Sequence, residues 1–258
     1  ISGCITTIRK VSVKAGHSLT MPCNYHYEYT NHVKYLCKGK TWKTCSYEVK
    51  TNCPHHSGKF TISDHKTMGI FTVTINHLMY YDTGYYWCAV EIDNGGDFGE
   101  LFHLEVNTGT PALYTNHQKI TGFIGDSMRI WFHSRNRGEL KWCRLGRSCA
   151  TVTSKSMDGT HLAINENPNN NFTVTMSGLR TESSGWYYFV KGDLQMPVHL
   201  TVTERPSTTH TTVSYSSDKV DLKKLIIPLA LLIFIVMMTL IIWFILKTHS
   251  KSLLVSRS

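Results

Sequence analysis

The sequence predicts an all-β fold, in which two tandem β-sandwich domains are followed by a stalk and a single transmembrane helix. Three observations lead to this prediction: short apolar alternations along most of the chain, a pattern that occurs twice, and one unbroken apolar run near the carboxyl end. With 258 residues, the chain has room for one or two domains of ordinary size. Its 41% hydrophobic and 17% charged residues exclude both a disordered polyelectrolyte and a protein wholly embedded in a membrane.

An internal repeat divides the part before the apolar run into two copies. Phe71-Thr-Val-Thr-Ile-Asn-His-Leu78 matches Phe172-Thr-Val-Thr-Met-Ser-Gly-Leu179, and Gly16 matches Gly125. The offset between the copies shrinks toward the carboxyl end, as expected if the second copy has lost a few residues in its loops. We therefore expect tandem domains at 1-107 (domain 1) and 108-203 (domain 2).

Short apolar alternations, separated by turn-forming residues, predict the strands. In the first copy Asp82-Thr-Gly84 and Asp93-Asn-Gly-Gly96 separate such runs, and neither copy sustains a helical period. The expected strands of the first copy are Val11 to Val13, Ser18 to Cys23, Val33 to Cys37, Phe60 to Ser63, Phe71 to Ile75, Tyr85 to Val90 and Leu101 to Val106. Their short and regular spacing favours a β-sandwich.

A cysteine pair in the first copy indicates the type of sandwich. Cys23 lies in an alternating strand, and Cys88 follows 65 residues later at the end of Asp-Thr-Gly-Tyr-Tyr-Trp-Cys. This spacing is typical of the disulfide between the sheets of an immunoglobulin variable-type domain. Tyr86 is placed for the hydrogen bond that fixes the turn into the second strand. We expect Lys59 and Asp82 to pair across the bottom of the sandwich, which is worth about 1 kcal/mol if the pair is partly exposed.

A second cysteine pair occurs in both copies. Cys37 ends Lys-Tyr-Leu-Cys and precedes Cys45, and Cys143 ends Lys-Trp-Cys and precedes Cys149. Here both domains resemble the polymeric immunoglobulin receptor and the CMRF-type leukocyte receptors, whose domains carry Lys-Tyr-Trp-Cys with another cysteine close behind. The resemblance implies a short disulfide within each pair that clamps two neighbouring strands. It also implies a cell-surface immune receptor, with immunoglobulin Fc or anionic phospholipid as its candidate ligands.

Domain 1 departs from the family pattern in its core. Leu36 stands where a tryptophan is expected before the clamp cysteine, so the ring that normally covers the central disulfide is missing. We expect Trp42 or Trp87 to compensate for it.

Domain 2 departs further. Phe132 and Phe189 replace both cysteines of the central disulfide, whereas Trp142 keeps the position before the clamp cysteine. Losing such a bridge typically costs about 2 to 5 kcal/mol. Two phenyl rings in edge-to-face contact between the sheets would recover part of that stability.

Two cysteines have no partner assigned by these patterns. Cys4 and Cys53 bridge each other, or Cys4 belongs to leader residue left by imprecise cleavage, or Cys53 pairs between chains. Cys53-Pro-His-His56 could suggest a metal site, but it lacks the two-residue spacings of structural zinc. We interpret it as a loop.

Three loops should meet at the tip of domain 1 and form its default ligand site. These rim loops are 24–32, 50–58 and 91–99. Tyr25, Tyr27 and Tyr29 alternate with polar residues in the first loop, and together with His32 they offer stiff amphipathic contact area. One or two of these tyrosines could instead be strand residues that face the core.

Charged residues provide further candidate ligand contacts. Lys38, Lys40 and Lys43 make the clamp hairpin basic, either for an anionic lipid or acidic protein patch or as a solvated edge. The last rim loop carries the candidate contacts Glu91, Asp93 and Asp97. Converging carboxylates can hold calcium, but Asp-Asn-Gly-Gly is also a good hairpin turn. We favour the turn and predict no metal site.

The segment 225-246 is predicted to be the transmembrane helix. Its 22 residues carry no ionisable side chain, and as a helix they would cover about 33 Å, close to the thickness of a bilayer core. All eight cysteines precede it, which suits an oxidising extracellular side. We therefore expect a single-pass type I protein of the plasma membrane with an extracellular amino terminus. Residues 204-224 form a Ser/Thr-rich stalk and juxtamembrane segment, and the cytoplasmic tail 247-258 contains no tyrosine.

The motifs favour binding over catalysis. No nucleophile elbow, zinc-protease helix, phosphate loop or dinucleotide fingerprint occurs, so we expect neither an enzyme nor a cofactor. Domain 1 has no basic arm for nucleic acid. The leading hypothesis is an immune receptor that binds a protein or an anionic phospholipid, with an unidentified signalling adaptor; the alternative is an adhesion or structural surface protein that binds other immunoglobulin domains. Asn171-Phe-Thr is the only N-glycosylation sequon.

Overall fold

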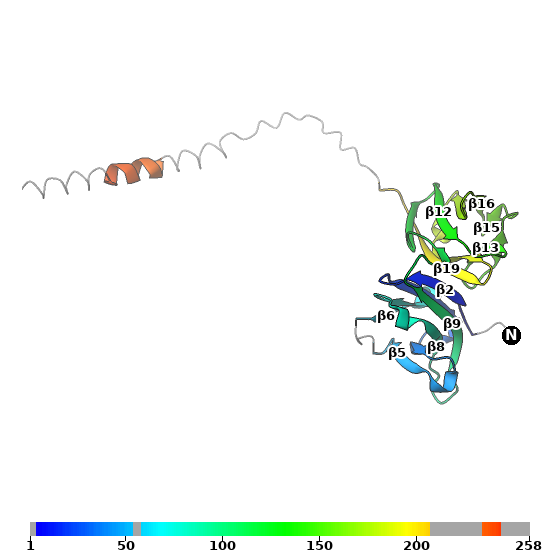
Figure 1. The fold of residues 1–258 in the computed structure, drawn as a ribbon. Helices are drawn as coiled ribbons and strands as arrows, with labels where there is room; N and C mark the ends of the chain where they lie inside the picture. Colours follow the sequence, from blue (N-terminus) through cyan, green and yellow to red (C-terminus); the bar gives the residue numbers. More distant parts are fainter. Residues whose placement is uncertain (1–3, 54–57, 207–233, 244–258) are drawn as a thin grey trace, which may run out of the picture. The chain divides into compact units, whose positions relative to one another are not determined.

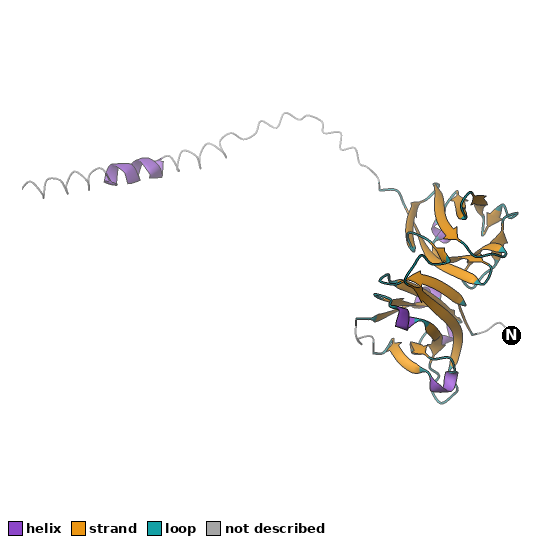
Figure 2. Ribbon diagram, in the orientation of Figure 1, coloured by secondary structure: helices purple, strands orange, loops and turns teal. Residues whose placement is uncertain are grey.

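The computed structural model describes residues 4–53, 58–206 and 234–243, in two compact units, Ile1–Arg205 and Pro206–Ser258. The first unit is built almost entirely of strands (Figure 1), and its helical segments are single 3-10 turns (Figure 2). The prediction of an all-β fold with more than one domain is confirmed for this unit. Domain 1 ends its last strand at Asn107, and the first strand of domain 2 begins at Leu113.

Domain 1 is a sandwich of two sheets. The first sheet has the order β1 (Ile5–Thr7), β3 (Leu19–Tyr25), β7 (Ile70–Ile75), β6 (Phe60–His65). The second has the order β2 (Lys10–Lys14), β9 (Phe98–Asn107), β8 (Gly84–Val90), β4 (Lys34–Lys38), β5 (Ser46–Lys50). All pairings are antiparallel except β2 with β9. Strands β1 and β5 were not expected from the sequence, because β1 has only three residues and β5 is a mostly polar segment in which only Val49 is buried.

Domain 2 repeats this architecture with two sheets of five strands. One sheet has the order β10 (Leu113–Tyr114), β12 (Ser127–Ser134), β17 (Asn171–Ser177), β16 (Thr160–Asn167), β15 (Ser156–Met157). The other has the order β11 (Lys119–Phe123), β19 (Leu194–Thr203), β18 (Gly185–Lys191), β13 (Leu140–Arg144), β14 (Cys149–Thr151). The parallel pair β11 and β19 corresponds to β2 and β9 of domain 1.

Each domain buries an apolar layer between its sheets. In domain 1, Cys23 of β3 and Cys88 of β8 form the central disulfide, with Cα atoms 6.1 Å apart. Leu36, Phe71 and the disulfide are fully buried in this core. The alternation of facing residues along β3 and β8 therefore brings the two cysteines together from opposite sheets.

Residues of the two domains also contact each other within the first unit. Lys10 Nζ lies 2.8 Å from Asp193 Oδ2. Gln118 uses its side-chain amide to accept a hydrogen bond from the backbone N–H of Thr20, at 2.9 Å, and to donate one to the carbonyl of the same residue. The Gln118 amide thus provides hydrogen-bond partners for the backbone N–H and carbonyl of Thr20, in the part of β3 that does not pair with β1.

The predicted transmembrane segment 225-246 lies mostly outside the described residues. Its described part, 234–243, is helical and exposed. Among the residues that the structure describes, no helix reaches the length and apolar character needed to cross a bilayer. The predicted stalk lies outside the described residues from position 207 onward, and the predicted tail does so entirely.

Candidate ligand-binding surfaces of the first domain

Of the three tyrosines expected to contact a ligand from the first rim loop, only some are exposed to solvent. Tyr27 begins the turn η1 (Tyr27–Tyr29) and is 78% exposed. Tyr29 is half-buried, and its ring lies 5.8 Å from that of Phe98 in β9 and 5.7 Å from that of His32. Tyr25 is only 3% exposed, which corrects its assignment as a ligand contact. It lies two residues after Cys23 on the same strand, so its side chain points to the same buried face.

A buried polar network anchors this loop. Lys34 is fully buried, and its Nζ lies 3.0 Å from Asp64 Oδ2. The same Nζ donates a hydrogen bond to the carbonyl of Thr30 at 2.8 Å and lies 4.2 Å above the centre of the Tyr25 ring. Tyr25 donates its hydroxyl to Asp64 Oδ1 at 2.7 Å. Burial lowers the pKa of Lys34, although Asp64 opposes this shift. Burial and the bond to Asp64 together raise the pKa of Tyr25. The network therefore holds Thr30, within the loop, against the core.

The last rim loop is fixed by Asp97. Its two carboxylate oxygens accept hydrogen bonds from the Tyr35 hydroxyl at 2.7 Å and from the Ile92 backbone N–H at 3.0 Å. Burial, followed by the bond to Asp97, raises the pKa of Tyr35. Glu91 pairs with Lys50 at 2.7 Å, whereas Asp93 remains exposed in the turn. The carboxylates thus make separate contacts, and the described residues contain no group of three or more potential metal ligands.

The outer face of the second sheet carries an aromatic cluster. The Tyr35 ring lies 5.0 Å from that of Tyr47 and 6.4 Å from that of Trp42, and Trp87 meets Trp42 edge to face at 5.0 Å. Lys50 lies 4.1 Å above the Tyr47 ring. Tyr47 itself is 59% exposed. This cluster was missed by the sequence analysis, although the alternation around the buried Leu36 places Tyr35 on the outer face.

Neither candidate tryptophan replaces the missing core ring. Trp42 and Trp87 pack with Tyr35 and with Cys37 and Cys45 on the outer face, so the expectation that one of them covers the central disulfide is wrong. Trp87 precedes the buried Cys88 and must therefore point the other way. The Trp42 ring covers Gly99, where an added Cβ would lie 2.1 Å from ring atom Cζ3. Close approach of this ring requires glycine at position 99.

The clamp hairpin lies at the edge of the same sheet. A disulfide joins Cys37 to Cys45, and a second one joins Cys143 to Cys149 in domain 2. Between the cysteines of the first clamp, Lys40 and Lys43 are exposed; Lys38 is half-buried and donates to the carbonyl of Tyr81 at 3.3 Å. The basic hairpin is thus joined to the turn that precedes β8.

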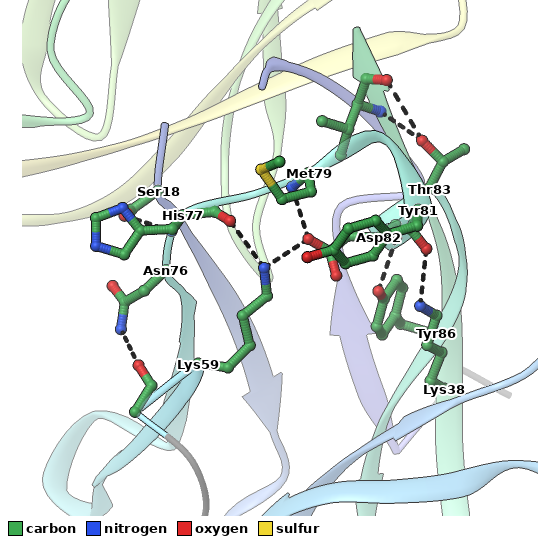
Figure 3. Close-up of polar contacts among 12 residues, drawn as sticks. Ser18, Lys38, Lys59, Asn76, His77, Met79, Tyr81, Asp82, Thr83 and Tyr86 are labelled. Atoms are coloured by element: carbon green, nitrogen blue, oxygen red, sulfur yellow. Dashed lines mark hydrogen bonds and ion pairs between the residues drawn. The ribbon is translucent and has the colours of Figure 1, made fainter. Parts of the chain in front are cut away.

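That turn, η4 (Tyr80–Asp82), is fixed by Asp82 (Figure 3). The carboxylate Oδ2 accepts from the Met79 backbone N–H at 2.7 Å and lies 2.6 Å from Lys59 Nζ. The Asp82 carbonyl accepts from the hydroxyl of the buried Tyr86 at 2.7 Å. Burial raises the pKa of Tyr86. These contacts fix the chain where it enters β8, at the end of the sandwich opposite the rim.

Domain 2 builds the same turn with different side chains. In η5 (Thr181–Ser183), Ser183 takes the place of Asp82: its hydroxyl accepts from the Arg180 backbone N–H at 3.1 Å and bonds to the Thr160 hydroxyl at 2.9 Å. Tyr187 donates to the carbonyl of Ser183 at 2.9 Å. A neutral hydrogen bond thus replaces the ion pair in a turn of the same form.

Aromatic rings fill the position of the central disulfide in domain 2. Phe132 and Phe189 are fully buried and stack with ring centroids 4.3 Å apart and planes 9° apart. The expected edge-to-face arrangement is therefore wrong. Trp142 lies 5.9 Å from Phe132 and stacks on Tyr187 at 5.2 Å. Each phenylalanine makes its tilted contact with another ring: Phe132 with Trp142, at 59° between planes, and Phe189 with Phe172, at 47°.

The glycosylation sequon lies at the start of β17. Asn171 is half-buried, and its Nδ2 donates to the Pro168 carbonyl at 3.1 Å. The Thr173 side chain is buried, and its hydroxyl accepts from Asn167 Nδ2 at 2.6 Å.

Cys4 is a free thiol, so it does not bridge to Cys53. Its sulfur accepts a hydrogen bond from the Tyr29 hydroxyl at 3.5 Å, which places it beside the first rim loop. Cys53 is exposed and lies next to positions 54–57, outside the described residues.

Comparisons with known proteins show what this chain is similar to. The immunoglobulin V-set domain family matches residues 6–107. Human CMRF35-like molecule 7 is 30% identical over 138 residues, which cover 50% of this chain and 68% of that protein. The bovine polymeric immunoglobulin receptor is 25% identical over 190 residues, covering 67% of this chain and 24% of the receptor. The crystal structure of a teleost fish polymeric Ig receptor ectodomain shares 30% identity, covering 78% of this chain and 98% of that one, with a TM-score of 0.39.

The fold and the sequence match define a protein with a V-set immunoglobulin domain. More narrowly, the chain belongs to the family of the CMRF35-like molecules, and it is also similar to the polymeric immunoglobulin receptor. It spans 65% of human CMRF35-like molecule 5 and about a quarter of the polymeric immunoglobulin receptors that it matches.

Proposed function

We propose that this chain is a single-pass type I immune receptor of the plasma membrane that binds its ligand through the rim of domain 1. Immunoglobulin Fc and anionic phospholipid are the candidate ligands. Family membership supports the receptor class, and the apolar segment 225-246 supports the membrane anchor.

One observation carries the rim assignment. In the first and the last rim loop, contacts within domain 1 hold the backbone in place, and aromatic side chains remain exposed to solvent. Lys34 holds the first loop and Asp97 holds the last, while Tyr27 and Phe98 remain exposed. A loop that is already ordered loses less conformational entropy on binding, and exposed aromatic rings supply much of the energy at protein interfaces. The rim therefore has the properties of a preformed recognition surface.

The test displays the full chain on cells and measures binding of soluble polymeric immunoglobulin by flow cytometry. Tyr27→Ser combined with Phe98→Ser should weaken binding about thirtyfold, since each ring would contribute roughly 1 kcal/mol. The exposed Trp131 of domain 2 provides the control, and Trp131→Ser should leave binding unchanged. Equal binding by the rim variant and the parent chain would contradict the rim assignment.

The exposed outer face of domain 1 favours adhesion as a second candidate function. Tyr47 projects from the aromatic cluster on a sheet face that is open in the described part of the chain. Cells that display the chain would then aggregate with one another, and Tyr47→Ser would reduce that aggregation. Aggregation that is unaffected by this substitution would argue against this face.

A further inference from the structure

Domain 2 exposes a tryptophan in the middle of a sheet. Trp131 of β12 is 49% exposed, whereas its neighbours Ile130 and Phe132 are buried. Because side chains alternate along a strand, Trp131 lies on the outer face of the sheet in which β12, β17 and β16 are neighbours. Packing inside domain 2 therefore does not explain a large apolar ring at this position.

The glycosylation sequon lies on the neighbouring strand of the same face. Thr173 pairs directly with Trp131, and Asn171 pairs with His133. Residues paired in an antiparallel ladder point to the same face, so Asn171 is a diagonal neighbour of Trp131, at a Cβ separation of roughly 7 to 8 Å. The Asn171 Nδ2 uses one hydrogen for its bond to the Pro168 carbonyl and has a second one that a sugar can replace.

The side chain opposite the sequon asparagine is directed toward another strand. The His133 ring stacks on the Tyr114 ring of β10, with centroids 4.8 Å apart and planes 14° apart. Strand β10 lies on the side of β12 opposite β17. On β16, the exposed Asn165 offers an amide to sugar hydroxyls. A sugar on Asn171 can thus reach the Trp131 ring across the surface between β12 and β17.

Domain 1 uses the corresponding face differently. By the internal repeat, Pro22 corresponds to Trp131 and is buried. Ile70 corresponds to Asn171 and is buried against Trp186 of domain 2. A glycan at this position would obstruct a protein interface of that kind. The sequon therefore favours the glycan itself, rather than a second protein, as the group that covers Trp131.

We propose that an N-linked glycan on Asn171 folds back onto domain 2 and stacks its first sugar residues on the Trp131 ring. The transfer forms a bond between Asn171 Nδ2 and C1 of the N-acetylglucosamine of a lipid-linked oligosaccharide. It breaks the bond from C1 to the lipid pyrophosphate, which leaves with the electron pair of that bond, and Nδ2 gives up one proton.

The stacked sugar would complete the outer face of domain 2. The C–H groups on one side of a pyranose ring meet the electron-rich face of the indole, and both surfaces leave water. The glycan then contributes to the stability of the fold, besides its usual solubilising effect. This inference goes beyond the proposed function and shares with it only the passage of domain 2 through the secretory pathway.

The first test measures oxidation of Trp131 by hydroxyl radicals, using mass spectrometry of the full chain produced in mammalian cells. The same digest gives the glycan occupancy of Asn171. Trp131 should be oxidised at least about twofold more slowly in the glycosylated chain than in the Asn171→Gln variant, since the sugar covers a ring face. Tyr47, which is exposed in domain 1, should react equally in both. An unoccupied Asn171, or equal oxidation of Trp131, would overturn the proposal.

The second test is a double-mutant cycle on the melting temperature of the same full chain. Asn171→Gln should lower it by about 4 °C more in the parental chain than in a chain with Trp131→Thr. The cycle cancels the lost bond to Pro168, because that loss is common to both backgrounds.

Arg129→Thr is the matched control for the cycle. Arg129 is exposed on the same face as Trp131 but pairs with Thr175, further from the sequon asparagine. In this background Asn171→Gln should have its full parental effect. Equal losses of melting temperature with and without the indole ring would show that the glycan acts independently of Trp131 and would refute the stacking.

Discussion

Tyr35 donates its hydroxyl to Asp97 at 2.7 Å, and this bond joins the outer face of domain 1 to its last rim loop. The tyrosine ring belongs to the aromatic cluster, and the carboxylate also accepts the backbone N–H of Ile92. Movement of the loop is therefore coupled to packing on the sheet face.

Tyr35→Phe should loosen the last rim loop while the sheet stays intact. The ring remains, but Asp97 loses one of its two donors, at a cost of about 1.5 to 3 kcal/mol for a bond to a charged group. Amide hydrogen exchange at residues 92–97 should become faster. Tyr85→Phe is the control, since that ring lies on the same face of the sheet without a bond to the loop. Unchanged exchange in the Tyr35 variant would contradict the coupling.

Asp82→Ala should destabilise domain 1 by about 2 to 4 kcal/mol, because it leaves the Met79 N–H without its acceptor and Lys59 without its charge partner. Asp82→Ser should cost less, since Ser183 accepts the corresponding backbone bond in domain 2. Urea denaturation of the compact unit Ile1–Arg205 measures both values. Equal losses for the two variants would show that the hydrogen bond to Met79 contributes nothing.

Phe132→Ala should cost about 3 to 5 kcal/mol, since it opens a cavity beside Phe189 in a fully buried layer. Arg129→Ala on the same strand should change the free energy of unfolding by no more than about 0.5 kcal/mol, because its side chain is exposed. Thermal denaturation followed by circular dichroism compares the two. A loss below about 1 kcal/mol for the phenylalanine variant would mean that the stacked rings do not substitute for the missing disulfide.

The stability of domain 2 should decrease as pH falls below about 6.5, the ordinary pKa of histidine. Burial lowers the pKa of His199 in the folded chain, and His65 and Lys119 add to this shift. Between the two pKa values the unfolded chain binds a proton that the folded chain does not, so the free energy of unfolding is largest above that range. His199→Gln should flatten the dependence of melting temperature on pH. His161→Gln, at an exposed position, should leave the slope as it is; a slope that survives in the His199 variant would refute the assignment.

The sequence was sufficient for the parts of the fold that depend on periodicity and spacing. Alternation along Leu19–Tyr25 and Gly84–Val90 brings Cys23 and Cys88 face to face. The internal repeat predicts the same arrangement of strands in domain 2. These features follow from a period of two residues, which is a local property of a strand.

The side-chain environments were harder to predict. Alternation alone would have assigned Tyr25 to the core, since it shares a face with Cys23, and Trp87 to the outer face. By contrast, the contact of Trp42 with Gly99 joins a turn to a strand distant in sequence, and the burial of Lys34 depends on Asp64 from the other sheet. Such contacts depend on tertiary packing, so no pattern along the chain reports them.

The stacked phenylalanines make the interior of domain 2 insensitive to redox conditions. Phe132 and Phe189 can pack without any oxidant, whereas the interior of domain 1 is completed only when Cys23 and Cys88 are oxidised. A reductant would therefore break the central disulfide of domain 1. In domain 2 it would break only the clamp disulfide at the edge of a sheet. During biosynthesis, the core of domain 2 can therefore form before thiols are oxidised, whereas the core of domain 1 is completed only after oxidation.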